Sequence, residues 1–204
     1  MRRILIQLAH PVLERSRVNR HLVEAVRDLP NVTINDLYER YPDLGIDVKH
    51  EQRLLEDHDA IVFQHPFYWY SVPAILKEWQ DLVLEHGWAY GAGGDKLRGK
   101  ITFNSITAGG PKSAYNADGY NRFPTRTLLL PWEQTAHLCG MRYLGPFAVH
   151  GTLKVATHAD VHVASDAYRA LIEALRDDRI DLERAAKSDD IYHELEVLLR
   201  REVA

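Results

Sequence analysis

Three stretches of the sequence carry side chains that can bind a ligand, and each follows a short apolar run. In the first, Ala9–Ser16, an Ala-His-Pro turn leads to Ser16-Arg17-Val18-Asn19, which opens a predicted helix. The first turn of a helix presents unpaired N–H groups and a partial positive charge, which attract phosphate. The candidate phosphate ligands are His10, Ser16, Arg17 and Asn19. These residues fit equally well a turn followed by a serine that only caps the helix.

The second stretch, Gln64–Ser71, contains four consecutive aromatic residues, Phe67, Tyr68, Trp69 and Tyr70. A helix would space its core aromatics three or four residues apart, so this run is not an ordinary core stripe. Prolines at both ends restrict the backbone and stiffen the loop. A rigid aromatic loop suits a flat, conjugated ligand, and it is also suited to packing against a partner subunit.

The third stretch, Thr107–Tyr120, begins Thr107-Ala108-Gly109-Gly110. Paired glycines let the backbone approach a ligand closely and point N–H groups at it. The carbonyl and ring-nitrogen acceptors of a flavin would match such donors, which would also stabilise the negative charge of a reduced flavin. Taken alone, the glycines indicate a tight turn. Tyr115 and Tyr120 lie farther along the stretch, within reach of a substrate on the same ring.

The elements between these stretches alternate in type. The expected strands are Ile4–Leu8, Val32–Leu37, Ala60–Phe63, Ile101–Ile106 and Tyr143–Val149. Apolar residues at helical spacing predict helices from Val18 to Leu29, Ile75 to Val83, Thr127 to Cys139 and Ala164 to Leu175. This alternation predicts an α/β fold with a five-stranded parallel sheet covered on both faces. Ligands of such folds bind beyond the carboxyl ends of the strands, which is where the three stretches begin.

Composition excludes several classes of protein. The chain has 204 residues and a formal charge of −4, so we expect no nucleic-acid partner. Its single cysteine, Cys139, excludes a disulfide framework. Because we find neither a secretory leader nor an 18-residue apolar run, we expect a cytoplasmic protein. We expect one domain over residues 1–204, with a C-terminal helical tail over 181–204.

Other site types lack their patterns. No G-x-G-x-x-G, P-loop or G-x-S-x-G motif is present. His158 and His162 stand four residues apart, but no third ligand is evident nearby, so we expect no metal site.

Together, the motifs resemble the flavodoxin-like NAD(P)H:quinone oxidoreductases, and most resemble the bacterial branch that serves as the ancillary subunit of glutathione-gated potassium efflux antiporters. The resemblance runs from the first strand to about Gly151. Its middle motif is long and specific. The motifs are His10-Pro11 with Ser16 and Asn19, His65-Pro66-x-x-Trp69-x-Ser71-x-Pro73-x-x-Leu76-Lys77-x-Trp79-x-Asp81-x-Val83, His86-Gly87-Trp88-Ala89-Tyr90-Gly91, and Thr107-x-Gly109-Gly110.

The resemblance implies a flavodoxin-like three-layer sandwich, a homodimer and a non-covalent flavin, either FMN or FAD. The flavin phosphate side would be held by His10, Ser16, Arg17, Val18 and Asn19. The isoalloxazine edge would be lined by Phe67, Tyr68, Trp69 and Tyr70, and its pyrimidine end by Thr107, Ala108, Gly109 and Gly110.

The activity implied is ping-pong transfer of a hydride from NAD(P)H through flavin N5 to a quinone or a similar flat electrophile. Tyr115 falls at the position of a family tyrosine that assists this transfer. A family histidine is replaced by Asn121, which argues against a histidine relay at that position. The alternative is a flavin-binding regulatory subunit of a potassium efflux antiporter at the inner face of the membrane. The residues distinguish neither FMN from FAD nor NADH from NADPH.

Overall fold

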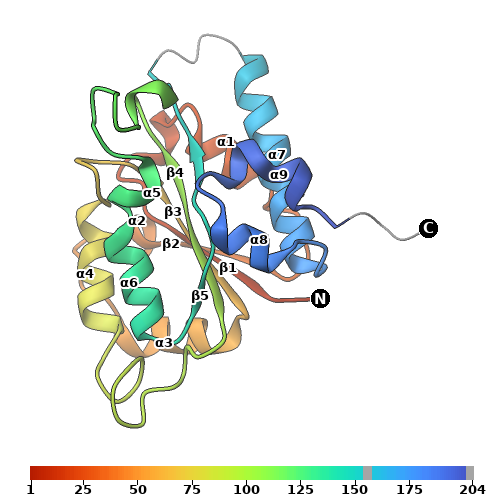
Figure 1. Ribbon diagram of the computed structural model, residues 1–204. Coiled ribbons are helices and arrows are strands. Elements are labelled where there is room, and N and C mark those ends of the chain that lie inside the picture. The colour runs from red at the N-terminus through yellow and green to blue at the C-terminus, as the bar shows by residue number, and fades with distance from the viewer. Residues whose placement is uncertain (154–157, 201–204) are drawn as a thin grey trace.

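A parallel β-sheet lies between two layers of helices (Figure 1). The computed structural model describes residues 1–153 and 158–200. The strands are β1 (Ile4–Leu8), β2 (Val32–Asp36), β3 (Ala60–Pro66), β4 (Ile101–Thr107), β5 (Arg142–Tyr143) and β6 (Phe147–Val149). Their order is β2-β1-β3-β4-β5, and β6 also pairs with β4. These pairings are parallel, which confirms the predicted flavodoxin-like α/β class.

Helices cover both faces of the sheet. One face carries α1 (Asn19–Glu24), α7 (His158–Arg176), α8 (Leu182–Lys187) and α9 (Ile191–Leu198). The other carries α2 (Leu37–Arg40), α3 (Val48–Asp57), α4 (Ala74–Val83) and α6 (Leu130–Leu138), which α5 (Thr125–Leu128) precedes. Alternate residues of β1 point to opposite faces. Ile4 and Ile6 therefore join the first core, and Leu5 joins the second.

The final strand differs from its prediction. The run Tyr143–Val149 forms two short strands, β5 and β6, which pair with opposite ends of β4. Two residues between them explain the break. Pro146 has no N–H to donate to the ladder. Gly145 receives the backbone of the C-terminal segment so closely that a Cβ there would overlap the Ser188 carbonyl oxygen. The sheet thus has five positions, and two strands share the last.

Several other boundaries differ from the prediction. β3 and β4 continue to Pro66 and Thr107, so these residues belong to the sheet rather than to the loops. Helix α1 starts at Asn19 and ends at Glu24, short of the expected Leu29. The helix expected from Thr127 to Cys139 is divided into α5 and α6, with a proline in the first turn of α6.

The C-terminal helices pack on the sheet. Ile191, Leu195 and Leu198 of α9 are buried in the same core as Phe147 of β6. The amino terminus reaches the same region, because the Arg2 guanidinium donates to the Leu175 carbonyl at 2.8 Å and to Asp178 Oδ1 at 2.7 Å. Among the described residues, no helix has the length and apolar character needed to cross a membrane.

Candidate functional site

The three candidate loops leave the sheet at one edge, and backbone hydrogen bonds hold their first residues together. The Ala9 N–H donates to the Gln64 carbonyl at 2.9 Å, and the Phe67 N–H donates to the Thr107 carbonyl at 2.8 Å. The Ala108 N–H donates to the Val149 carbonyl at 2.8 Å. These bonds continue the parallel ladder past the strand ends. They therefore fix where each loop begins relative to the others.

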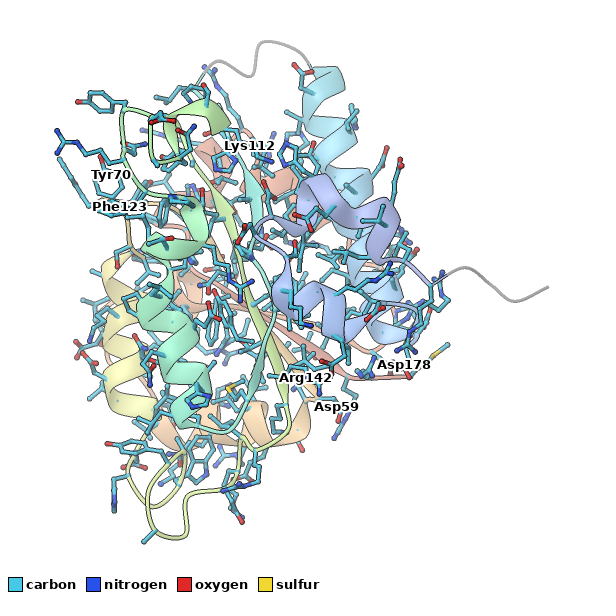
Figure 2. The ribbon with its side chains drawn as sticks, in the orientation of Figure 1. Asp59, Tyr70, Lys112, Phe123, Arg142 and Asp178 are labelled. Carbon is cyan, nitrogen blue, oxygen red and sulfur yellow. The ribbon has the colours of Figure 1, made fainter. Side chains whose placement is uncertain are left out.

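A cavity of ≈ 600 Å³ opens between the second and third loops. Figure 2 shows Tyr70 and Phe123 together at this end of the molecule. Aromatic side chains form much of the wall, and backbone from the glycine-containing third loop forms another part. The lining residues are Phe67, Trp69, Tyr70, Gly110, Pro111, Ser113, Ala114, Tyr115, Tyr120 and Asn121. Five of these, Phe67, Trp69, Tyr70, Gly110 and Tyr115, are residues that the sequence predicted for the site.

The aromatic loop is a tight turn in an unfavourable backbone conformation. The Ser71 N–H donates to the Tyr68 carbonyl at 2.9 Å. The two central residues, Trp69 and Tyr70, have φ of 50° and 61°. This left-handed conformation costs a non-glycine residue about 1–2 kcal/mol. Such a turn with two positive φ values normally uses asparagine or glycine. The strain presents Trp69, which is 92% exposed, at the mouth of the cavity.

Contacts from the third loop support the strained turn. The Tyr70 hydroxyl donates to Asn121 Oδ1 at 3.1 Å. The Tyr70 ring packs edge-on against Phe67, with ring centroids 6.4 Å apart. Asn121 therefore bridges the two walls of the cavity at the position where the family resemblance leads one to expect a histidine.

A buried histidine lies under the same turn. His65 is fully buried, and desolvation lowers its pKa from 6.5 to about 4. Its Nδ1 lies 3.0 Å from the Pro66 carbonyl oxygen, and its Nε2 lies 3.1 Å from Asn104 Nδ2. Because a carbonyl can only accept, Nδ1 carries the proton and Nε2 accepts from Asn104. The Tyr143 hydroxyl donates to Asn104 Oδ1 at 2.7 Å and completes the chain.

The first loop lies outside this cavity. The hydroxyl oxygen of Ser16 accepts the Asn19 N–H at 3.0 Å, so Ser16 caps this first amide of α1 from the loop, whereas the N-cap position itself is Val18. His10 accepts the Val12 N–H through Nδ1 at 3.2 Å, and burial lowers its pKa. Arg17 is exposed, whereas Val18 is buried in the core. The capping role and a phosphate-binding role for Ser16 are compatible, because its hydroxyl proton is not used in the cap.

Asn19 links the first loop to the third through the interior. Its side chain is buried and donates to Thr107 Oγ1 at 2.7 Å. Gln64 of β3 donates to the Asn19 carbonyl at 3.1 Å and to Asn19 Oδ1 at 3.3 Å. The Tyr168 hydroxyl of α7 in turn donates to Gln64 Oε1 at 3.0 Å. Asn19 and Thr107 thus fix α1 against the end of β4, with their side chains directed into the protein.

The remaining predicted residues surround the cavity without lining it. Ala108 is buried where the third loop begins, and Gly109 follows it half-buried. A Cβ at Gly109 would lie 2.9 Å from the Leu153 side chain. Tyr68 is half-exposed on the outer side of the aromatic turn.

Tyr115 is held on the wall of the cavity by two rings. Its centroid lies 6.2 Å from that of Phe67 and 5.1 Å from that of His150. Partial burial raises the pKa of the Tyr115 phenol, so the hydroxyl keeps its proton at neutral pH and can donate a hydrogen bond.

His150 does not line the cavity but supports its wall through the contact with Tyr115, and the sequence did not predict this role. It follows β6 directly, and its Nε2 lies 2.9 Å from Thr125 Oγ1. Its Nδ1 is buried without a hydrogen-bond partner among the described residues. Burial lowers its pKa, and the carboxylate of Asp190 opposes that shift. The signal was available, because a polar residue directly after the last strand must lie at the same edge of the sheet as the three loops.

Comparisons with known proteins agree with this fold. The sequence profile of the family with the flavodoxin-like fold matches residues 2–172. The glutathione-regulated potassium-efflux system ancillary protein KefG of Pectobacterium atrosepticum is 51% identical over 148 residues, which cover 72% of this chain and 81% of KefG.

Solved structures are similar over most of the chain. The general stress protein 14 of Treponema denticola in complex with FMN superposes with a TM-score of 0.81 and is 39% identical. The similarity covers 85% of this chain and 99% of that protein. An NADPH-quinone reductase from P. pentosaceus has a TM-score of 0.76 and is 32% identical, covering 83% of this chain and 96% of that one. The sequence motifs, the sheet order and these matches together show that the chain belongs to the flavodoxin-like family.

Proposed function

We propose that this protein is a flavin-dependent NAD(P)H:quinone oxidoreductase that binds FMN non-covalently in the cavity between the second and third loops. One observation carries the proposal: aromatic side chains from one loop and glycine-bearing backbone from another enclose ≈ 600 Å³ at the carboxyl edge of the sheet. A mostly aromatic cavity with a few polar groups suits a planar heterocycle. The similarity to the FMN-bound Treponema protein supports FMN over FAD.

The donor set fits such a cofactor. Phe67, Tyr68, Trp69 and Tyr70 would lie along the ring system, with Gly109 and Gly110 at its polar end. The backbone at the start of α1, with Ser16, Arg17 and His10, would hold the phosphate. Val18 would contribute through its backbone, because its side chain is buried. Asn19, Thr107 and Ala108 would position these groups from behind.

A flavin held by these residues would supply two-electron transfer from NAD(P)H to a quinone or similar acceptor, with ping-pong kinetics. The chain supplies position and polarity. The Tyr115 phenol donates a hydrogen bond to an oxygen of the substrate, and Phe67 and His150 keep its ring in place. The aromatic turn excludes water from one side of the cavity and offers a flat surface to the substrate ring.

We further propose that the protein functions as a homodimer. Large aromatic side chains at the mouth of the cavity are exposed, among them Trp69, Tyr120 and Phe123. Clustered exposed apolar side chains mark interaction surfaces. A second copy that covers them would complete the wall of the cavity.

The experiment has two stages. The purified protein should be yellow or take up added FMN, and it should then oxidise NAD(P)H faster when a quinone is present. Tyr115→Phe should keep the flavin and lower kcat/KM for the quinone about tenfold or more, because it lacks the hydroxyl donor. A colourless protein that takes up neither FMN nor FAD would refute the proposal.

The similarity to KefG favours a second candidate, a cytoplasmic regulatory subunit that binds flavin and docks on a potassium efflux antiporter at the inner face of the membrane. Flavin uptake without quinone-dependent turnover, together with copurification with an antiporter, would favour this role. Rapid turnover in the isolated protein would favour the enzyme.

A further inference from the structure

The C-terminal segment is attached to the loop that forms one wall of the cavity. Asp190, which lies between α8 and α9, is buried, with 6% of its surface exposed. Its Oδ2 accepts from Lys112 Nζ at 3.1 Å. Lys112 begins the short 3-10 helix η2 (Lys112–Ala114), two of whose residues line the cavity. Asp190 thus holds the third loop, although it lies about 80 residues farther along the sequence.

Asp190 is itself fixed by several contacts. Its N–H donates to Ser188 Oγ at 3.2 Å, and His193 Nδ1 lies 2.7 Å from its Oδ2. The next N–H, that of Ile191, donates to the Pro146 carbonyl at 2.9 Å. Arg126 Nη1 donates to the Ser188 carbonyl at 2.6 Å. The segment that carries Asp190 is therefore anchored beside β6 and α5 by contacts that do not involve Lys112.

The break between β5 and β6 makes this attachment possible. The Gly145 N–H donates to the Ala185 carbonyl at 2.8 Å, and the Ser188 carbonyl occupies the place that a side chain at residue 145 would need. A glycine at this position lets two backbones meet closely. The break between β5 and β6 thus accommodates the backbone of the C-terminal segment.

Lys112 connects Asp190 to Tyr115. The Tyr115 N–H donates to the Lys112 carbonyl at 3.0 Å, which closes the turn of η2. The same lysine therefore meets Asp190 with its side chain and Tyr115 with its backbone. The Tyr115 ring also lies 5.1 Å from His150, which follows β6, so a backbone bond to Lys112 and a ring contact together place the tyrosine.

We propose that Asp190 is a positioning residue for the site: through Lys112 it holds the turn that carries Tyr115 on the wall of the cavity. This inference rests on the proposed function, because it assigns the third loop to the side where the substrate binds. It gives the C-terminal segment a role that the family motifs, which end near Gly151, do not assign.

The first test needs no cofactor. Hydrogen exchange of the Ala114, Tyr115 and Asn121 amides, which all have backbone acceptors, is compared between wild type and Lys112→Gln. We expect exchange about threefold to tenfold faster in the variant, the range expected for loss of one partly buried, charge-assisted bond. Lys112→Arg keeps the charge and should restore slow exchange.

The matched control is Arg142→Gln. Arg142 of β5 pairs with Glu183 of α8 at 3.2 Å, so it also joins the sheet to the C-terminal segment. Figure 2 shows it well away from Lys112. This variant should leave the exchange of the three amides unchanged. Equal effects of the two variants, or no effect of either, would overturn the inference.

The second test uses the FMN-loaded enzyme. Lys112→Gln should raise KM for the quinone several-fold and change kcat less, because it misplaces Tyr115 without removing it. Asp190→Asn should reproduce both effects, and Gly145→Ala, if it folds, should reproduce the exchange effect by displacing the segment. Faster exchange with unchanged KM in Lys112→Gln would overturn the positioning role. If the wild type binds no flavin, the proposed function fails, whereas the exchange result still decides the attachment.

Discussion

Two clusters of buried polar side chains lie on opposite faces of the sheet, and they differ in what they connect. The Glu51 cluster centres on the buried carboxylate of α3, which accepts from Gln7 of β1 at 2.7 Å, Asn35 of β2 at 3.0 Å, Tyr41 at 2.8 Å and the Trp79 indole of α4 at 2.8 Å. Its members face inward and pack within the layer of α3 and α4.

The Asn19 cluster is formed by Asn19, Gln64, Thr107 and Tyr168. It has fewer hydrogen bonds than the Glu51 cluster, but it extends to the edge of the sheet where the loops begin. It runs from α7 through β3 to the first turn of α1 and the end of β4. Both clusters satisfy buried polar groups that would otherwise be costly. Burial and hydrogen bonding alone therefore do not mark a site. Because the Asn19 cluster ends at two of the loops, we expect it to affect binding at the proposed site.

The largest expected effect comes from Glu51→Ala. The substitution leaves several buried donors without an acceptor and opens a cavity, so the free energy of unfolding should fall by about 3–5 kcal/mol. Urea unfolding measures the loss. Glu56→Ala, which removes an exposed carboxylate bonded to the Trp88 indole at 2.8 Å, is the control and should change stability by less than about 1 kcal/mol. FMN affinity should stay within twofold for the folded fraction of either variant.

Asn19→Ala tests the Asn19 cluster and should weaken both the fold and flavin binding. It removes the donor to Thr107 and one of the two acceptors of Gln64, which keeps the carbonyl of residue 19, at an expected cost of about 2 kcal/mol in the free energy of unfolding. Because the start of α1 then loses its tie to β4, FMN should bind about tenfold more weakly. Titration by flavin fluorescence measures the affinity. Equal losses of affinity in this variant and in Glu51→Ala would mean that general destabilisation explains both.

His65, which lies near the proposed site, makes the free energy of unfolding depend on pH. Its folded pKa of about 4 lies below the unfolded value of 6.5, so the unfolded state binds more protons between these values. The contribution of His65 to the free energy of unfolding is therefore favourable above about pH 6.5, and it is lost as the pH falls toward 4. We expect the wild type to lose about 2 kcal/mol more than His65→Gln between about pH 7 and pH 5. Urea midpoints at the two pH values test this, and parallel losses would contradict it.

The smallest expected effect is a gain in the free energy of unfolding rather than a loss. Trp69→Gly relieves one left-handed residue and removes little buried surface, so stability should rise by up to about 1 kcal/mol. The same change removes an aromatic wall, so FMN affinity should fall. Opposite signs for stability and binding would identify strain retained for function. Ser71→Ala, next to the strained pair, serves as the control.

The fold was predictable because its signals are local. The continuous apolar run of β1 and the helical spacing in α4 each reflect burial that a few neighbouring residues reveal. The break between β5 and β6 was not predictable in this way. It depends on Ser188 meeting Gly145, a contact between segments far apart in the chain.

The site was predictable where its residues follow strands in sequence. Phe67, Trp69, Tyr70, Gly110 and Tyr115 meet at one cavity as expected from strand ends at one edge of a sheet. The roles of Asn19 and Thr107 as internal supports required knowing where their side chains point. His150 and Asp190 required knowing which segments the fold brings beside the third loop.

The tie between Arg2 and the end of α7 has a consequence for biosynthesis. Strand β1 is made before the other strands of the sheet, yet Arg2, two residues ahead of it, is held by Leu175 and Asp178, which lie 173 and 176 residues farther along the chain. Contacts between the two ends of a chain form slowly, because the intervening loop must close first. In the growing chain on the ribosome, β1 therefore stays incompletely covered until α7 has been made. A chaperone that shields β1 should matter more to this protein than its size suggests.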